Sequence, residues 1–97
     1  MPTYITLVNY TQKGIENIKE SPERLDKVKK AMKAAGGEFK AFYLTMGHYD
    51  MVVISEAPND AVYAATILAI GAAGAVRSET LKAFTENEYR EIIASLP

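Results

Sequence analysis

Apolar and polar residues alternate near the start of the chain in the pattern of a half-buried strand. Residues 3–10 read TYITLVNY, in which Ile5 and Leu7 alternate with Tyr4 and Thr6. β-Branched and aromatic residues dominate the segment, as is typical of strands. We therefore predict the first strand over residues 3–10.

Two further strand-like segments, residues 39–46 and 49–55, are separated by Gly47 and His48. A two-residue loop with glycine first is typical of a type II′ turn, so we predict an antiparallel hairpin. A fourth strand is predicted over residues 75–83, although charged residues interrupt its apolar pattern.

The segments between these strands have helical signals. Residues 11–20 predict a short helical turn, after which Ser21 as cap and Pro22 at the first helical position open the main helix. Gly36 and Gly37 end it. A second helix is predicted from Ala61 to about Ala73, with Gly71 and Gly74 as its stop, and a third follows the capping box formed by Thr85 and Glu88.

The predicted order is β-α-β-β-α-β-α, which indicates an α+β fold. It is the ferredoxin-like βαββαβ sandwich, a four-stranded antiparallel sheet with two helices on one face, plus an extra C-terminal helix. A length of 97 residues suits one domain, residues 1–97.

One face of such a sheet has no helices over it, and here both faces are predicted to be rather apolar. The second helix strengthens this point, because residues 61–76 contain no charge and a helix of this kind favours burial nearly all round. The segment is too short to span a bilayer, which needs about 20 apolar residues. We therefore expect the chain to associate with itself, most simply as a dimer packed sheet to sheet.

Composition excludes several kinds of function. The net charge of −1 does not favour nucleic acid, and the absence of cysteine excludes disulfides and thiolate chemistry. No secretory signal pattern opens the sequence, so we expect a cytoplasmic protein. Since the chain has one histidine and no cysteine, we predict no metal site and no cofactor.

The stretch GHYDMVVISEAPND, the alanine-rich helix after it and the segment AVRSETLKAFTENEY together resemble the GYD-domain family. The matching hairpin residues are Gly47, Tyr49 and Asp50, with His48 between glycine and tyrosine. The resemblance spans nearly the whole chain and implies a dimeric α+β barrel. Relatives of that superfamily include cofactor-free monooxygenases and haem-handling enzymes, while the family itself has no assigned activity.

The hairpin is the first candidate for chemistry. His48 and Asp50 lie two residues apart, so the carboxylate could raise the pKa of the imidazole in an acid-base pair. A histidine at a turn beside glycine is more commonly a solvated residue, and an aspartate there commonly binds backbone amides. We favour this second interpretation.

The second candidate is a small-molecule pocket between the two sheets of a dimer. An apolar pocket with a few converging polar groups is the usual form of such a site. Asp50 and Arg77 are alternatively predicted to form a structural ion pair. The residues expected to line the pocket are Tyr4, Tyr43, Tyr49, Asp50 and Arg77.

Three classes of function therefore remain. The leading one is a homo-oligomeric domain that binds a small apolar or aromatic ligand. The others are a cofactor-independent enzyme, monooxygenase-like or isomerase-like, that uses the polar groups of the pocket, and a structural or regulatory oligomer.

Overall fold

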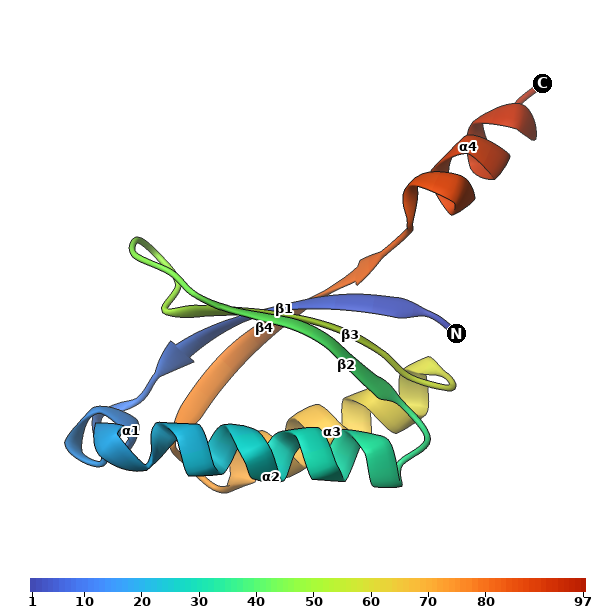
Figure 1. The fold of residues 1–97 in the computed structure, drawn as a ribbon. Coiled ribbons are helices and arrows are strands. Elements are labelled where there is room, and N and C mark those ends of the chain that lie inside the picture. The colour runs from blue at the N-terminus through green and yellow to red at the C-terminus, as the bar shows by residue number, and fades with distance from the viewer.

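A four-stranded antiparallel sheet with helices against one of its faces forms the body of the protein, in a computed structural model that describes residues 1–97 (Figure 1). The α+β, ferredoxin-like fold and the extra C-terminal helix predicted above are confirmed. The elements are β1 (Thr3–Tyr10), α1 (Gln12–Glu16), the 3₁₀ turn η1 (Ile18–Glu20), α2 (Ser21–Ala34), β2 (Glu38–Leu44), β3 (Met51–Glu56), α3 (Asp60–Ala72), β4 (Val76–Ala83) and α4 (Glu86–Ala94).

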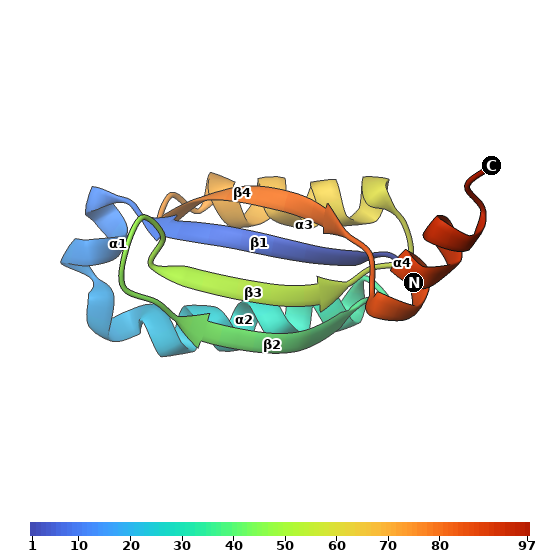
Figure 2. The same ribbon diagram turned by 90° about the horizontal axis from the view of Figure 1, so that it is seen from above.

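The strand order is β2-β3-β1-β4, so β1 and β3 are central and β2 and β4 are edges. Leu7 of β1 lies opposite Val52 of β3 and Glu79 of β4, which sets the register. Helix α2 lies under β2 and α3 under β4, seen through the sheet in Figure 2. We call the side covered by these helices the helix face and the other side the open face.

The alternation in β1 separates the two faces. Tyr4, Thr6 and Val8 are buried on the helix face, while Ile5 and Leu7 point to the open face and are half-buried. The ring of Tyr4 stacks on that of Tyr63 in α3, with their centroids 4.1 Å apart. This stack anchors α3 to the sheet.

The core on the helix face consists of two clusters. Tyr4, Met32, Ala57 and Tyr63 form the first. Val8, Met51 and Val53 form the second. Only 11 of the 97 residues are buried, because one layer of helices covers a single face of the sheet. Much apolar side-chain surface is therefore exposed in the isolated chain.

The helix ends agree with the sequence signals except at Ser21 and at Gly71, which was predicted to end the second helix but lies inside α3. Ser21 is the first residue of α2 and not its cap, because the cap position belongs to Glu20 and the Ser21 hydroxyl bonds to Tyr10 at 2.9 Å. Gly74, with φ +86°, provides the left-handed turn after α3. The capping box of Thr85 and Glu88 is confirmed at α4.

The predicted two-residue turn between β2 and β3 is wrong. The strands end at Leu44 and start again at Met51, and the loop between them is longer. The Thr45 amide donates to the Asp50 carbonyl at 2.8 Å, and the Thr45 hydroxyl donates to the Tyr49 carbonyl at 2.6 Å. Hydrogen bonds from a side chain to the backbone, such as the one from the Thr45 hydroxyl, compete with regular strand pairing. The regular pairing therefore ends at Leu44 and Met51.

Helix α4 extends away from the body on the open-face side (Figure 1). The radius of gyration is 14.6 Å and the longest dimension 52 Å, whereas a compact chain of this length has a radius of about 13 Å. The apolar residues of this arm, all exposed, are Phe84, Tyr89, Ile92, Ile93 and Leu96. None of the helices is both long and apolar enough to cross a membrane.

Candidate functional site

The open face is an apolar surface at the centre of the sheet. The strand registers place Ile5, Leu7, Val52 and Ile54 together on it. Tyr43 and Leu81, on the two edge strands, extend it and are 59% and 44% exposed. Helices α2 and α3 lie on the other side of the sheet, so no helix packs on this surface.

Two projections border the open face. The loop between β2 and β3 rises at one end, and the β4–α4 segment rises at the other (Figure 1). Met46 in the loop is fully exposed. The open face is therefore a shallow saddle with apolar side chains on its floor and on both rims.

Tyr49 connects the loop to the edge strand β4. Its hydroxyl donates to the Glu79 carboxylate at 2.7 Å. This bond, together with the negative charge of Glu79, raises the pKa of Tyr49. Glu79 lies opposite Leu7 in the sheet, so the tyrosine side chain reaches β4 from a loop between β2 and β3. The contact fixes the loop over one end of the open face.

Asp50 has a structural role in the same loop. Its carboxylate accepts a hydrogen bond from the Tyr10 amide at 2.9 Å, and its own amide donates to Val8 and to the Asn9 side chain. The predicted ion pair with Arg77 is wrong, because the carboxylate is engaged by backbone and no salt bridge joins the two residues. Arg77 lies on the open face opposite Asn9.

His48 lies exposed in the loop, and no hydrogen bond joins it to Asp50. The carboxylate that would orient the imidazole instead binds the backbone of β1. The acid-base pair considered from the sequence is therefore not formed in this structure.

Tyr4 does not join the other predicted pocket residues. It lies on the helix face, buried, whereas Tyr43, Arg77 and the side chain of Tyr49 are on the open face. A single pocket lined by all five predicted residues is therefore wrong. The sequence pattern did not predict on which face of the sheet Tyr4 lies, because β1 has aromatic or aliphatic residues on both of its faces.

Tyr4 belongs to a polar group that sequence reasoning missed. Its hydroxyl donates to the Asp60 carboxylate at 2.5 Å, and Lys82 binds the other carboxylate oxygen at 3.0 Å. Burial, then the bond to Asp60 and its charge, raise the pKa of Tyr4 to about 12. The bonds from Tyr4 and Lys82 lower the pKa of Asp60. Tyr4 is thus a protonated donor at neutral pH.

A second missed group lies beside it. The Tyr63 hydroxyl is 2.5 Å from the Thr6 hydroxyl and accepts a bond from Ser55 at 3.0 Å. All three residues are buried. Their mutual bonds satisfy polar groups that would otherwise be costly to bury. The only advance signal was the spacing of Tyr63 on the inward side of α3.

No three His, Asp or Glu side chains converge as metal ligands would.

The second apolar surface of the chain is the outer face of α3, which has no charged residue after Asp60 and exposes Leu68 to 74%. The exposed members of this outer face are Ala61, Ala64, Ala65, Leu68, Ala69 and Ala72. Both surfaces are formed mainly by apolar side chains.

Comparison with known proteins agrees with these features. The sequence profile of the GYD domain matches residues 4–93. A protein of Thermus thermophilus named glutamine synthetase and cystathionine beta-lyase binding protein is 34% identical over 84 residues, which are 86% of this chain and 88% of that protein. The crystal structure of TTHA0845, also from Thermus thermophilus, has a TM-score of 0.56 at 21% identity, covering 88% of this chain and 95% of that one, and shows the same fold.

Proposed function

The chain belongs to the GYD-domain family, and from this we propose that it is a homodimeric binding module for a metabolic enzyme. Two copies seal their open faces against each other, and the outer faces of their α3 helices receive the partner. The uncovered apolar open face carries the proposal.

The apolar floor of the open face supports the proposed dimer. Ile5, Leu7, Val52 and Ile54 are neighbours on the open face. Apolar surface gains about 25 cal/mol per Å² when it leaves water. Sheets that pack face to face bury such rows of side chains in a common core. A two-fold axis would bring the same four residues from each copy together.

The rims support the same arrangement. Helix α4 extends on the open-face side, where its exposed Tyr89, Ile92 and Ile93 would lie against the second copy. A helix of nine residues is marginal alone, because helices shorter than about 12 residues need packing to be stable. In the proposed dimer this arm packs against the second copy.

The partner enzyme is inferred from the relative whose name states that it binds glutamine synthetase and cystathionine β-lyase. In the proposed dimer the open faces are buried and the outer faces of α3 stay exposed. Their surface is alanine-rich and uncharged after Asp60, and Leu68 is its largest exposed side chain. Such a patch is suited to a protein partner.

The first experiment measures the mass of the chain by analytical ultracentrifugation at micromolar concentration. We expect wild type and Ala31→Glu to be dimers and Ile54→Glu to be a folded monomer, because the latter places a charge at the centre of the seam. Ala31 is exposed on α2, so it tests the effect of an added charge alone. A monomeric wild type, or a dimeric Ile54→Glu, would contradict the dimer.

The second experiment measures binding of the dimer to purified glutamine synthetase and cystathionine β-lyase from the same organism, by biolayer interferometry. We expect binding to at least one enzyme, its loss in Leu68→Glu, and its retention in Ala31→Glu. Loss of binding with an unchanged dimer mass would separate the enzyme surface from the seam. Wild type that binds neither enzyme would refute the partner assignment and leave the dimer intact.

A further inference from the structure

A cavity of about 210 Å³ lies between the sheet and helices α2 and α3, on the opposite side of the sheet from the open face. Both core clusters contribute to its wall, Met32 and Tyr63 from the first and Val8 and Val53 from the second. Fifteen of its 20 lining residues are hydrophobic. Protein interiors are normally close-packed, so a space of this size and character is suited to an apolar guest.

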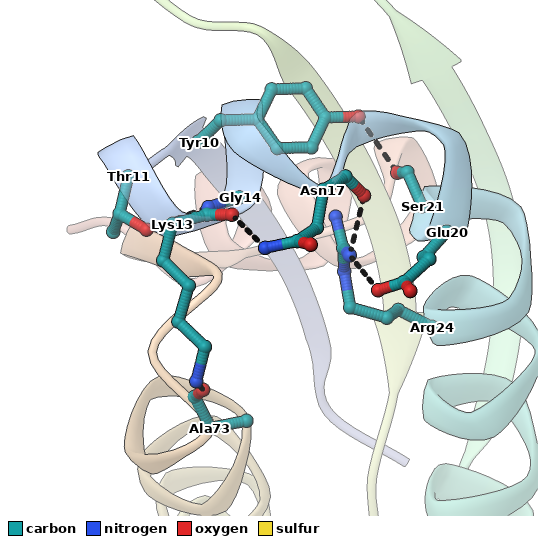
Figure 3. A network of polar contacts seen from close by, with 9 residues as sticks. All are labelled: Tyr10, Thr11, Lys13, Gly14, Asn17, Glu20, Ser21, Arg24 and Ala73. Carbon is teal, nitrogen blue, oxygen red and sulfur yellow. Dashed lines mark hydrogen bonds and ion pairs between the residues drawn. The ribbon is translucent and has the colours of Figure 1, made fainter.

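Polar groups gather at the end of the cavity near α1 and the start of α2. Tyr10, Ser21 and Arg24 all line it. The Tyr10 and Ser21 hydroxyls bond to each other at 2.9 Å (Figure 3). Arg24 Nη1 donates to the Asn17 carbonyl at 3.0 Å and lies 3.8 Å from the Glu20 carboxylate. The cavity is therefore mostly apolar, with these polar side chains at one end and Thr6, Lys27 and Ser78 as its other polar lining residues.

Arg24 has a donor that the chain does not use. Its Nη2 is buried and has no hydrogen-bond partner, whereas the contacts to Asn17 and Glu20 are made by Nη1. A buried charged donor without a partner is costly. The acceptor that best complements a guanidinium is a carboxylate, whose geometry matches the guanidinium fork.

We propose that this cavity binds a small monocarboxylate with an apolar body, its carboxylate on the guanidinium of Arg24 and its body between α2, α3 and the sheet. An apolar cavity of about 150 Å³ accommodates benzene, so the larger cavity here suits a single ring with a short carboxylate arm. The proposal does not depend on the dimer or on the partner enzyme, because the cavity lies within one chain and on the other face of the sheet.

The test uses phenylacetate and its neutral analogue phenylacetamide, with binding measured by calorimetry and by NMR shifts of the cavity methyl groups. We expect wild type to bind the acid at least about tenfold more tightly than the amide, the discrimination typical of a hydrogen bond to a charged group. In Arg24→Met that preference disappears. In Arg90→Met it persists, since Arg90 is an exposed arginine in α4.

A second variant, Val28→Phe, fills the cavity with a side chain of the chain itself. We expect it to bind neither compound. Equal binding of acid and amide by wild type, an acid preference that survives in Arg24→Met, or the absence of any binding at millimolar phenylacetate would each overturn the proposal. The comparison of Arg24→Met with Arg90→Met decides the question even if Val28→Phe fails to fold.

Discussion

Single hydroxyl groups connect the helices to the sheet in this protein. Tyr4 is the clearest case, because its ring stacks on Tyr63 while its hydroxyl reaches Asp60 in the first turn of α3. An aromatic residue with a polar tip can satisfy both an apolar neighbour and a carboxylate. The acidic residue also lies at the positive end of the α3 dipole, where it is favoured.

We expect Tyr4→Phe to lower the free energy of unfolding by about 1 kcal/mol at pH 7, the usual net value of a hydrogen bond. Tyr43→Phe should change it little, because Tyr43 is exposed and its hydroxyl is open to water. Urea denaturation of the three proteins measures both. Equal stability of Tyr4→Phe and wild type would contradict the role of the bond.

Wild type and Tyr4→Phe should also differ in pH dependence. The pKa of Asp60 is lowered in the folded state. Ionised Asp60 therefore contributes to the free energy of unfolding above its ordinary pKa of about 4, and this contribution is lost as the pH falls through the pKa of the folded state. The pKa of Tyr4 is raised to about 12, so its contribution is lost as the pH rises from about 10. The stability difference between the two proteins should therefore be largest between these limits and shrink toward both. A difference that stays constant with pH would contradict this linkage.

At the scale of elements, the short helix α1 joins the end of β1 to the turn after α3. Thr11 donates to the Gly74 carbonyl at 2.5 Å. Lys13 donates to the Ala73 carbonyl at 3.0 Å (Figure 3). Gly14 is buried against Ala75. The absence of a side chain at Gly14 is what allows the two segments to approach so closely.

We expect Gly14→Ala to lower the free energy of unfolding by about 2 kcal/mol or more, because an added Cβ would lie 2.0 Å from the Ala75 carbonyl oxygen. Gly71→Ala is the matched control. Nothing lies within 4 Å of a Cβ at Gly71, inside α3, so alanine there should raise stability by up to about 1 kcal/mol. Thermal unfolding of both variants measures the two changes in stability. If Gly14→Ala is as stable as wild type, Gly14 does not pack closely against Ala75.

At the scale of the whole molecule, the chain exposes apolar surface in three places: the open face, the outer face of α3 and the arm α4. Few residues are fully buried in the isolated chain. The proposed dimer would cover the open face and the arm together, because both lie on the same side of the sheet. The outer face of α3 would then remain for the partner enzyme.

We expect the double variant Ile92→Ser and Ile93→Ser to weaken the proposed dimer by at least about tenfold, because each buried isoleucine contributes roughly 1.5–3 kcal/mol. Glu91→Ser, on the same helix, should leave the dissociation constant unchanged. Sedimentation over a dilution series provides both values. If the double variant dimerises as tightly as wild type, α4 does not contact the second copy.

Much of this architecture is present in the residue pattern. Local sequence signals were enough to predict the order of elements and the ferredoxin-like fold. They include the alternation in residues 3–10, the helix cap at Thr85 and the turn residue Gly74. The family resemblance was carried by the same local segments, and the match over residues 4–93 confirms it.

Contacts between distant residues were decided only in the folded chain. Both parities of β1 are apolar, so the pattern separated Tyr4 from Ile5 without showing which one lies under the helices. The bond from Tyr4 to Asp60 spans 56 residues, and Asp50 binds the backbone of Tyr10 instead of Arg77. Local pattern reports the spacing of residues along one element, whereas these partners depend on how separate elements pack. The physical reason is that a hydrogen bond depends on distance in space and not on distance along the chain.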